Sequence, residues 1–271
     1  MTCETCSIVE LAARIELALA AHAAAYGTMI ALLCPQRQAA ALAIGGGWAA
    51  RTGRHLPINR AFGLGLRGPI DMATLDQLET FYRDEDLVSE VELCPLADAS
   101  LHSLLRQRGY QYRRCMHTLI SRAGGLLLPA PDDIEISVVS PEQTGTWVHT
   151  VAAGFGATTP TPEDSPDLLL PRSAMMRPNV TGFLATIGDE PAGAAAMAIG
   201  GGVAILFSAS TLPAFQRRGV HSALLTTRMA AAAAAGCDLV VAQVVPGSDS
   251  QRNLHRHGFQ VAYTNVILAR P

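Results

Sequence analysis

The spacing of apolar residues in the second half of the chain alternates between the period of a helix and that of a strand. Val148, Val151 and Phe155 recur at helical spacing, which predicts a helix that opens near Pro141. The next apolar runs are shorter and have a Gly-Asp-Glu-Pro turn between them, as in a hairpin. The expected elements are therefore a helix, two hairpin strands within 181–199 and a third strand within 200–212.

The remaining segments continue this succession. An Ala-rich stretch at 220–236 predicts a helix, with Gly236 as its C-terminal cap. We then expect a buried strand at 237–245, a short helix and an edge or closing strand at 259–269. Residues 156–178 are rich in Pro and Thr and are predicted to form a long loop. Together these elements predict an α/β fold, with a mixed central sheet flanked by helices on both faces.

The chain also reads as two similar halves. Residues 121–135 are rich in Gly and Pro and have neither period, which is typical of a linker. Each half ends with a Pro, a polar loop with Asp and Ser, a short helix, a Gly-aromatic pair and a strand that closes on Arg. This shared order favours an internal duplication. We therefore expect two such domains in tandem, at 1–124 and 132–271, with a linker at 125–131.

Composition narrows the class of protein. Hydrophobic residues make up 49% of the 271 and charged residues 16%, so a substantial core is expected. A net charge of -3 gives no general attraction to nucleic acid or to an anionic membrane, and neither is an expected partner. Arg14 and Glu16 interrupt the Ala-rich N-terminal stretch, which lacks a basic leader, so we expect no signal sequence and no membrane span.

The six cysteines are scattered, which suits reduced thiols and a cytoplasmic protein. Cys3 and Cys6 form a C-x-x-C pair that could be half of a zinc site. No second pair follows at ligand spacing, so two free thiols are the simpler interpretation and no metal is expected.

The turn between the third strand and the Ala-rich helix carries the main chemical signal. It reads TLPAFQRRGVHS over 211–222. A helix N-terminus presents unpaired N–H groups and about half a positive elementary charge, which favours a bound phosphate. Gly219 allows close approach of the backbone, and Arg217 and Arg218 add charge that suits phosphate. An ordinary strand-to-helix turn with solvated arginines remains the alternative.

The wider sequence resembles the GNAT-type N-acetyltransferase superfamily. The family's pyrophosphate loop is written Q/R-x-x-G-x-G/A, and Gln216, Gly219 and His221 occupy its three marked positions. The family's next signature is a strand, a small-residue loop and a short helix that ends in Gly-Phe. The stretch LVVAQVVPGSDSQRNLHRHGF follows at the matching distance. The resemblance covers about residues 132–271 and extends weakly to the first half.

The resemblance implies an acetyl-CoA site. The end of the third strand would lie beside the pantetheine arm, and the backbone from Arg217 to Ser222 would surround the pyrophosphate. Ser250 and Asn253 would lie near the thiol end, although a helix N-cap and a solvated helix position are equally good interpretations of these two residues. The cofactor-binding residues that the resemblance implies are Ser210, Thr211, Leu212, Gln216, Arg217, Arg218, Gly219, Val220, His221, Ser222, Ser250 and Asn253.

The sequence departs from the family pattern at the proton-transfer positions. His221 stands where the family has Gly or Ala, and Leu254 stands where a Tyr commonly protonates the leaving thiolate. The strand before the turn contains no acid to serve as a base. His149, Asp249 and His255 are candidates for proton transfer, but ordinary surface or capping roles are simpler for each. No catalytic residue is assigned from the sequence.

The first half lacks the phosphate-binding features. At the matching turn, Pro69 removes an N–H donor and Asp71 places negative charge where phosphate would lie. Asp71 is instead interpreted as a helix cap. We expect a degenerate domain that does not bind CoA.

These observations support three hypotheses. The first is an N-acyltransferase that moves an acetyl group directly from acetyl-CoA, its co-substrate, to an amine of a small molecule or of a protein or peptide. The second is a CoA-binding regulatory or interaction protein without turnover, and the third is a scaffold or antitoxin-like partner. A homodimer is compatible with each. Glu163, Asp164 and Asp167 in the predicted loop could attract a cationic amine, or they are solvated loop acids.

Overall fold

The computed structural model describes residues 7–158, 160–163 and 165–270 and divides the chain into two compact units. Unit 1 contains the residues up to His117 together with those from Tyr263 onward, and unit 2 runs from Thr118 to Ala262. Both units combine a sheet with flanking helices, which confirms the predicted fold class. Cys3 and Cys6 lie outside the described residues.

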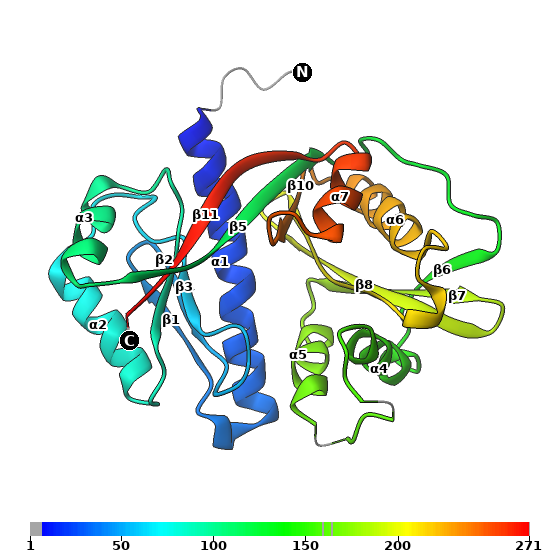
Figure 1. Ribbon diagram of the computed structural model, residues 1–271, viewed down its shortest axis with the longest axis horizontal. Coiled ribbons are helices and arrows are strands. Elements are labelled where there is room, and N and C mark those ends of the chain that lie inside the picture. The colour runs from blue at the N-terminus through cyan, green and yellow to red at the C-terminus, as the bar shows by residue number, and fades with distance from the viewer. Residues whose placement is uncertain (1–6, 159, 164, 271) are drawn as a thin grey trace. The chain divides into compact units, whose positions relative to one another are not determined.

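Unit 2 follows the predicted order of elements closely (Figure 1). The predicted hairpin at the Gly-Asp-Glu-Pro turn is present as two antiparallel strands, β7 and β8. Strand β9 is antiparallel to β8 but parallel to β10, so the sheet is mixed, as predicted. The elements are β6 Ile134–Val138, α4 Thr144–Gly154, α5 Pro166–Met175, β7 Val180–Ile187, β8 Glu190–Gly200, β9 Val203–Thr211, a 3-10 turn Pro213–Phe215, α6 Val220–Ala234, β10 Leu239–Val244 and α7 Asp249–Arg256.

The predicted long loop at 156–178 is wrong in one part, because helix α5 occupies Pro166–Met175. The side chain of Ser165 accepts a hydrogen bond from the backbone N–H of Asp167, which caps the helix. Pro166 stands in the first helical turn, where proline is favourable because its missing N–H has no helical partner. Pro171 lies inside the helix. The proline content that suggested a loop therefore belongs partly to a capped helix start.

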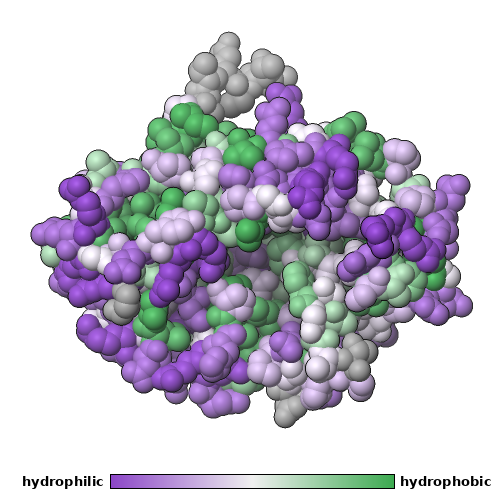
Figure 2. Space-filling view, in the orientation of Figure 1, coloured by the Kyte–Doolittle hydropathy of each residue, from purple (hydrophilic) through white to green (hydrophobic). Residues whose placement is uncertain are grey.

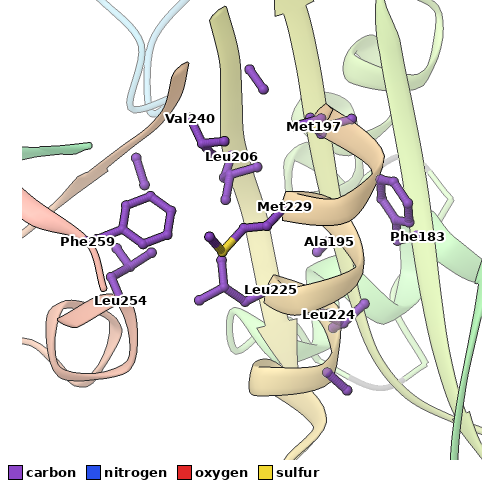
Figure 3. Close-up of a cluster of buried hydrophobic side chains, with 14 of the residues drawn as sticks. Phe183, Ala195, Met197, Leu206, Leu224, Leu225, Met229, Val240, Leu254 and Phe259 are labelled. Carbon is purple, nitrogen blue, oxygen red and sulfur yellow. The ribbon is translucent and has the colours of Figure 1, made fainter. Parts of the chain in front are cut away.

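Two hydrophobic clusters cover opposite faces of the sheet of unit 2. Leu224, Leu225 and Met229 of α6 are buried against one face (Figure 3). Helices α4 and α5 cover the other face, where Trp147 is fully buried and donates from Nε1 to the Ala195 carbonyl at 3.0 Å. These contacts fix the position of α6, whose N-terminus is the predicted phosphate-binding turn.

The strands of unit 1 are hydrogen-bonded in the order β1-β2-β3-β4-β11. The Gly run before Trp48 forms the turn of a hairpin between β1 and β2, with positive φ at Gly45 and Gly46. Strand β11 is antiparallel to β4, so the end of the chain completes the sheet of unit 1. The elements are α1 Ile8–Leu33, a 3-10 turn Pro35–Arg37, β1 Ala40–Ile44, β2 Gly47–Arg51, β3 Arg60–Phe62, α2 Met72–Arg83, β4 Ser89–Leu93 and α3 Ala99–Gln107. Two further strands, β5 Gln111–Arg122 and β11 Gln260–Arg270, have residues in both units.

Helix α1 is the one helix among the described residues that could span a membrane by its length and composition. Half of its most apolar 18-residue window is buried inside the structure. Ala20 and Ala23 of α1 pack with Ala50 and Phe62 of unit 1, and Glu16 is fully buried as well. The apolar character of α1 therefore serves at least in part to cover the sheet of unit 1.

Candidate functional site

The N-terminus of α6 opens into a pocket of about 750 Å³ within unit 2. The pocket is lined by all of the predicted cofactor-binding residues except Leu212 and Arg218. It also includes residues that the sequence did not single out for cofactor binding. These additional lining residues are Gly154, Ala209, Phe215, Asp249 and Arg256.

The start of α6 has the backbone geometry of an anion site. Gly219 is the N-cap with φ of +93°, and no side chain caps the helix. The first helical hydrogen bond is donated by Ala223 to the Gly219 carbonyl at 3.0 Å, so the N–H groups of the three preceding residues are outside the helical ladder. By contrast, α5 and α7 are capped by Ser165 and Ser248. The pocket thus faces an uncapped helix N-terminus.

Gly219 is needed for a reason that the sequence did not show. A Cβ atom at this position would lie 2.9 Å from Cγ of Pro131, and the positive φ disfavours any other residue. The close approach that the structure contains is therefore to Pro131.

The two arginines before Gly219 point to different partners. Arg217 lines the pocket and has φ of +62°. Arg218 donates from Nη2 to Asp133 at 2.7 Å, and its guanidinium lies over the Phe215 ring at 5.7 Å. Arg256 adds a second positive side chain to the pocket lining, and Asp249, the one acid in that lining, is paired with Arg252. The pocket is therefore electropositive.

Strand β9 reaches the pocket with one edge unpaired. Its parallel pairing with β10 ends at Ile205–Val241 within the described residues, although β9 continues to Thr211. Opposite β8, a bulge between Phe207 and Ser210 shifts the register, and Ser208 has φ of +50°. Backbone N–H and C=O groups beyond the bulge are left available to a ligand. Oγ1 of Thr211 is buried there and has no hydrogen-bond partner among the described residues.

Helix α7 supplies the other wall. Ser248, and not Ser250, is its N-cap, so the capping interpretation of Ser250 is wrong. Ser250 and Asn253 line the pocket, and Nδ2 of Asn253 lies 3.4 Å from Nδ1 of His221. The solvated interpretation of Asn253 is also incomplete, because the residue is half-buried.

Two histidines lie where α6 meets α7, and both are held in the neutral form. Burial, and then the positive charges of Arg228, His257 and Arg256, lower the pKa of His221 to about 4. Burial is also the main cause that lowers the pKa of His257, followed by Arg256 and Arg228, while the Leu126 backbone acts in the opposite direction. Neither ring brings a positive charge to the pocket near neutral pH in the absence of a ligand.

The proton-transfer candidates have other partners. His149 lies 3.1 Å from Glu163, which also pairs with Arg172. His255 contacts Gln251 and the Phe259 carbonyl. Asp249 alone of the three lines the pocket.

The position of Leu254 agrees with a packing role. Leu254 is only 3% exposed and lies in the cluster with Phe259, Leu225 and Met229 (Figure 3). A tyrosine that reached the pocket from this position would have to leave that cluster.

The acids of the predicted acceptor loop also have local partners. Glu163 pairs with Arg172 and His149, and Asp167 accepts from Ser165 in the first turn of α5. Asp164 lies outside the described residues.

The matching turn of unit 1 is closed by its own side chain. Asp71 is the N-cap of α2 and accepts hydrogen bonds from the backbone N–H of Thr74 at 2.8 Å and from its hydroxyl at 2.6 Å. These bonds lower the pKa of Asp71, which keeps the carboxylate charged. The predicted capping role of Asp71 is confirmed, and its charge occupies the place of an anion.

Comparison with known proteins identifies the class of this fold and site. The family model described as Acetyltransferase (GNAT) family matches residues 150–259, which include the pocket from Gly154 to Arg256. Members of this family use acetyl-CoA as co-substrate. This match assigns a GNAT-type acyltransferase domain to residues 150–259, which lie within unit 2.

Solved structures support the same fold across both units. A GCN5-related N-acetyltransferase from Kribbella flavida is 23% identical with a TM-score of 0.63, over 92% of this chain and 95% of that chain. A second GCN5-related N-acetyltransferase, from Sphaerobacter thermophilus, is 17% identical with a TM-score of 0.53, over 68% of this chain and 59% of that one. A tandem GNAT protein from the clavulanic acid biosynthesis pathway is 10% identical with a TM-score of 0.55, over 83% of this chain and 73% of that chain. No sequence match was found among curated proteins.

Proposed function

We propose that unit 2 transfers an acetyl group from acetyl-CoA directly to an amine. The observation that carries this proposal is the uncapped N-terminus of α6 inside an electropositive pocket, next to the unpaired edge of β9. The pocket volume of about 750 Å³ lies within the range of small-molecule sites. Among the described residues, no group of His, Cys, Asp or Glu side chains is arranged to hold a metal ion.

The residues present fit the parts of acetyl-CoA. The N–H groups of Val220, His221 and Ser222 would donate to the pyrophosphate, and Arg217 would add charge. The unpaired edge of β9 at Ser210 and Thr211 would form hydrogen bonds with the pantetheine arm, whereas the backbone of Leu212 already donates to Ala192 and accepts from Phe215. Gln216 and the Arg218 backbone would complete the turn around the phosphates, with Ser250 and Asn253 near the thiol end.

The bound co-substrate supplies an activated acetyl thioester. The chain's part is to hold the thioester and the amine nitrogen in line, which by itself provides a large share of the rate. N–H groups near the β9 bulge are suited to stabilise negative charge that develops on the thioester oxygen. Because Leu254 belongs to the core, water or Asp249 would have to move the proton, at a cost of about 10²- to 10⁴-fold compared with a well-placed acid.

One observation favours the second hypothesis, a CoA-binding protein without turnover. Leu254 occupies the position at which the family commonly has a tyrosine, and it is buried in the core. Strand β9 contains no Asp or Glu that could act as a base, which also favours CoA binding without turnover. The two functions differ in thiol release and not in CoA affinity.

Two measurements on the full chain separate these functions. Calorimetry with CoA is expected to show saturable binding at one site. Acetyl-CoA with a panel of small amines and Lys-containing peptides is expected to release free thiol in an amine-dependent way. Binding without thiol release would support the regulatory function, and absence of binding would contradict both.

Substitutions of the adjacent residues Arg217 and Arg218 form a matched pair that tests for a defined phosphate contact. Arg217→Ala removes a side chain that lines the pocket, and CoA affinity should fall about tenfold, because hydrogen bonds to charged groups contribute about 1.5–3 kcal/mol. Arg218→Ala removes a side chain that is paired with Asp133, so the effect should be smaller. Equal losses in both variants would indicate general charge attraction and not a defined phosphate contact.

A further inference from the structure

A buried histidine at the C-cap of α7 is hydrogen-bonded to the first turn of α6. Nε2 of His257 lies 2.7 Å from Oγ of Ser222, and His257 is only 1% exposed. Ser222 lines the pocket, whereas His257 does not. His257 can therefore act on a ligand in this pocket only through Ser222.

The chemistry of the pair depends on which group donates the hydrogen. A neutral imidazole has one N–H donor and one acceptor nitrogen, and a hydroxyl has a single hydrogen to donate. If Ser222 donates to Nε2, only oxygen lone pairs of Ser222 face the pocket, and these repel an anion. If Nε2 carries the hydrogen and donates to Ser222, the hydroxyl hydrogen is free to donate into the pocket. An anion next to Ser222 therefore selects the second arrangement.

The surroundings keep this choice between two neutral tautomers. The titratable and charged groups that act on His257 are Arg256 on α7 and Arg228 on α6, and both disfavour a charged ring. His221, on the same turn as Ser222, is itself neutral. The two tautomers contain the same number of protons, so the exchange between them leaves the net charge of the pair unchanged.

We propose that His257 is a positioning residue, which donates to Ser222 and so directs the Ser222 hydroxyl toward the pyrophosphate of CoA. This inference rests on the proposed function of the pocket. In this proposal His257, which precedes the Gly-Phe pair after α7, contributes to phosphate binding at the start of α6 through one hydrogen bond to Ser222. His257 and Ser222 then act as one unit, and their contributions to CoA affinity cannot be additive.

A double-mutant cycle with CoA, measured by calorimetry, tests the proposal. Ser222→Ala should lower CoA affinity about tenfold, as expected for loss of a hydrogen bond to a charged group. His257→Asn, whose amide is too short to reach Ser222, should cause a similar loss. In the Ser222→Ala background, His257→Asn should change the affinity by less than about twofold.

The conservative variant and a control separate positioning from a structural role. His257→Gln retains an N–H donor at the distance of Nε2, so its affinity should stay within about threefold of the wild type. His255→Leu, an exposed position on the same helix that does not line the pocket, should leave CoA affinity unchanged. Melting temperatures of all variants establish that they are folded.

The outcomes distinguish this inference from the proposed function. If the wild type does not bind CoA, the proposed function fails. If the wild type binds CoA but Ser222→Ala has the same affinity, or the two losses add in the double variant, the positioning role is overturned and the pocket assignment stands. Equal losses in His257→Gln and His257→Asn would also overturn it.

Discussion

Replacement of Glu16 by Gln should stabilise unit 1 increasingly as pH rises. Glu16 on α1 and Glu92 on β4 are both buried, and Nδ2 of Asn265 donates to each, at 2.8 Å and 3.1 Å. One arginine, Arg60, lies 3.2 Å from Glu92. Burial and the neighbouring Glu92 carboxyl group both disfavour the charged form of Glu16. Glu16 is therefore the group that retains a proton.

The magnitude follows from the pKa of Glu16. Burial, and then the charge of Glu92, raise this pKa from 4.5 to about 8. Between these two values the folded state binds a proton that the unfolded state has released, so stability falls by about 1.4 kcal/mol per pH unit. The loss levels off above the folded pKa. Between pH 6 and pH 8 the wild type should lose about 2–3 kcal/mol from this group, and Glu16→Gln should lose none of it.

Native-state hydrogen exchange on peptides from α1 and β4 measures this effect in unit 1 alone. After correction for intrinsic exchange rates, the difference in opening free energy between Glu16→Gln and the wild type should grow by about 2–3 kcal/mol from pH 6 to pH 8. All other titratable groups are common to both proteins, so their contributions cancel in this difference. Glu135→Gln, an exposed position on β6, should follow the wild type. A difference that does not change with pH would refute the assignment of the proton to Glu16.

Three further substitutions test the pocket. Gly219→Ala should weaken CoA binding and lower the free energy of unfolding by about 1–2 kcal/mol, because φ is +93° and the added Cβ would meet Pro131. Calorimetry measures the CoA affinity and urea unfolding measures the stability. Unchanged values of both quantities would contradict the cap geometry. Thr211→Val should leave the unliganded protein as stable or more stable by about 1 kcal/mol, since it removes a buried unpartnered hydroxyl, and should lower CoA affinity in the same assays. Leu254→Tyr should destabilise the core by about 1–3 kcal/mol without faster thiol release between pH 6 and pH 9; a tenfold increase in turnover would show that a missing acid limits the reaction.

The sequence predicted most of unit 2 because its elements differ clearly in period. The hairpin of β7 and β8, the strand β9 and the helix α6 all carry one unambiguous pattern. Helix α5 was missed because Pro166 and Pro171 are strong loop signals, and only Ser165 indicates a cap. Propensity cannot distinguish a proline in a first helical turn from a proline in a loop without the tertiary contacts of the segment.

The sequence could predict those parts of the site that are formed by residues close together in the chain. The prediction differs from the structure where a side chain is bonded to a residue that is distant in the sequence. Gly219, Arg217 and Ser222 are close in sequence, and they line one pocket. Arg218 is directed away by Asp133, which lies 85 residues earlier in the chain. The N-cap of α7 is Ser248 and not Ser250. The sequence alone does not determine the first residue of a helix to within two positions. That these residues contact CoA stays a prediction, which the variants above test.

Surface composition gave little further information about function. Hydrophilic and hydrophobic residues are interspersed on the face shown in Figure 2, in agreement with the modest net charge of -3. Exposed apolar side chains such as Phe155, Leu126 and Val245 come from different elements. Isolated apolar residues of this kind are normal on soluble surfaces.

Strand β11 shows why the chemistry of unit 1 could not be read from the first half alone. The sequence predicts an edge or closing strand at 259–269, but nothing in that segment identifies the strand with which it pairs. In the structure, residues 266–270 pair with β4, more than 170 positions earlier, and this register brings Asn265 to Glu16 and Glu92. Asn265 is fully buried and is the donor that both carboxyl groups share. Without it, each carboxyl group would lose that partner inside an apolar layer, at a cost of about 1–3 kcal/mol or more. The last strand of the chain therefore completes the buried polar network of unit 1, in which burial and the Glu92 carboxyl group raise the pKa of Glu16.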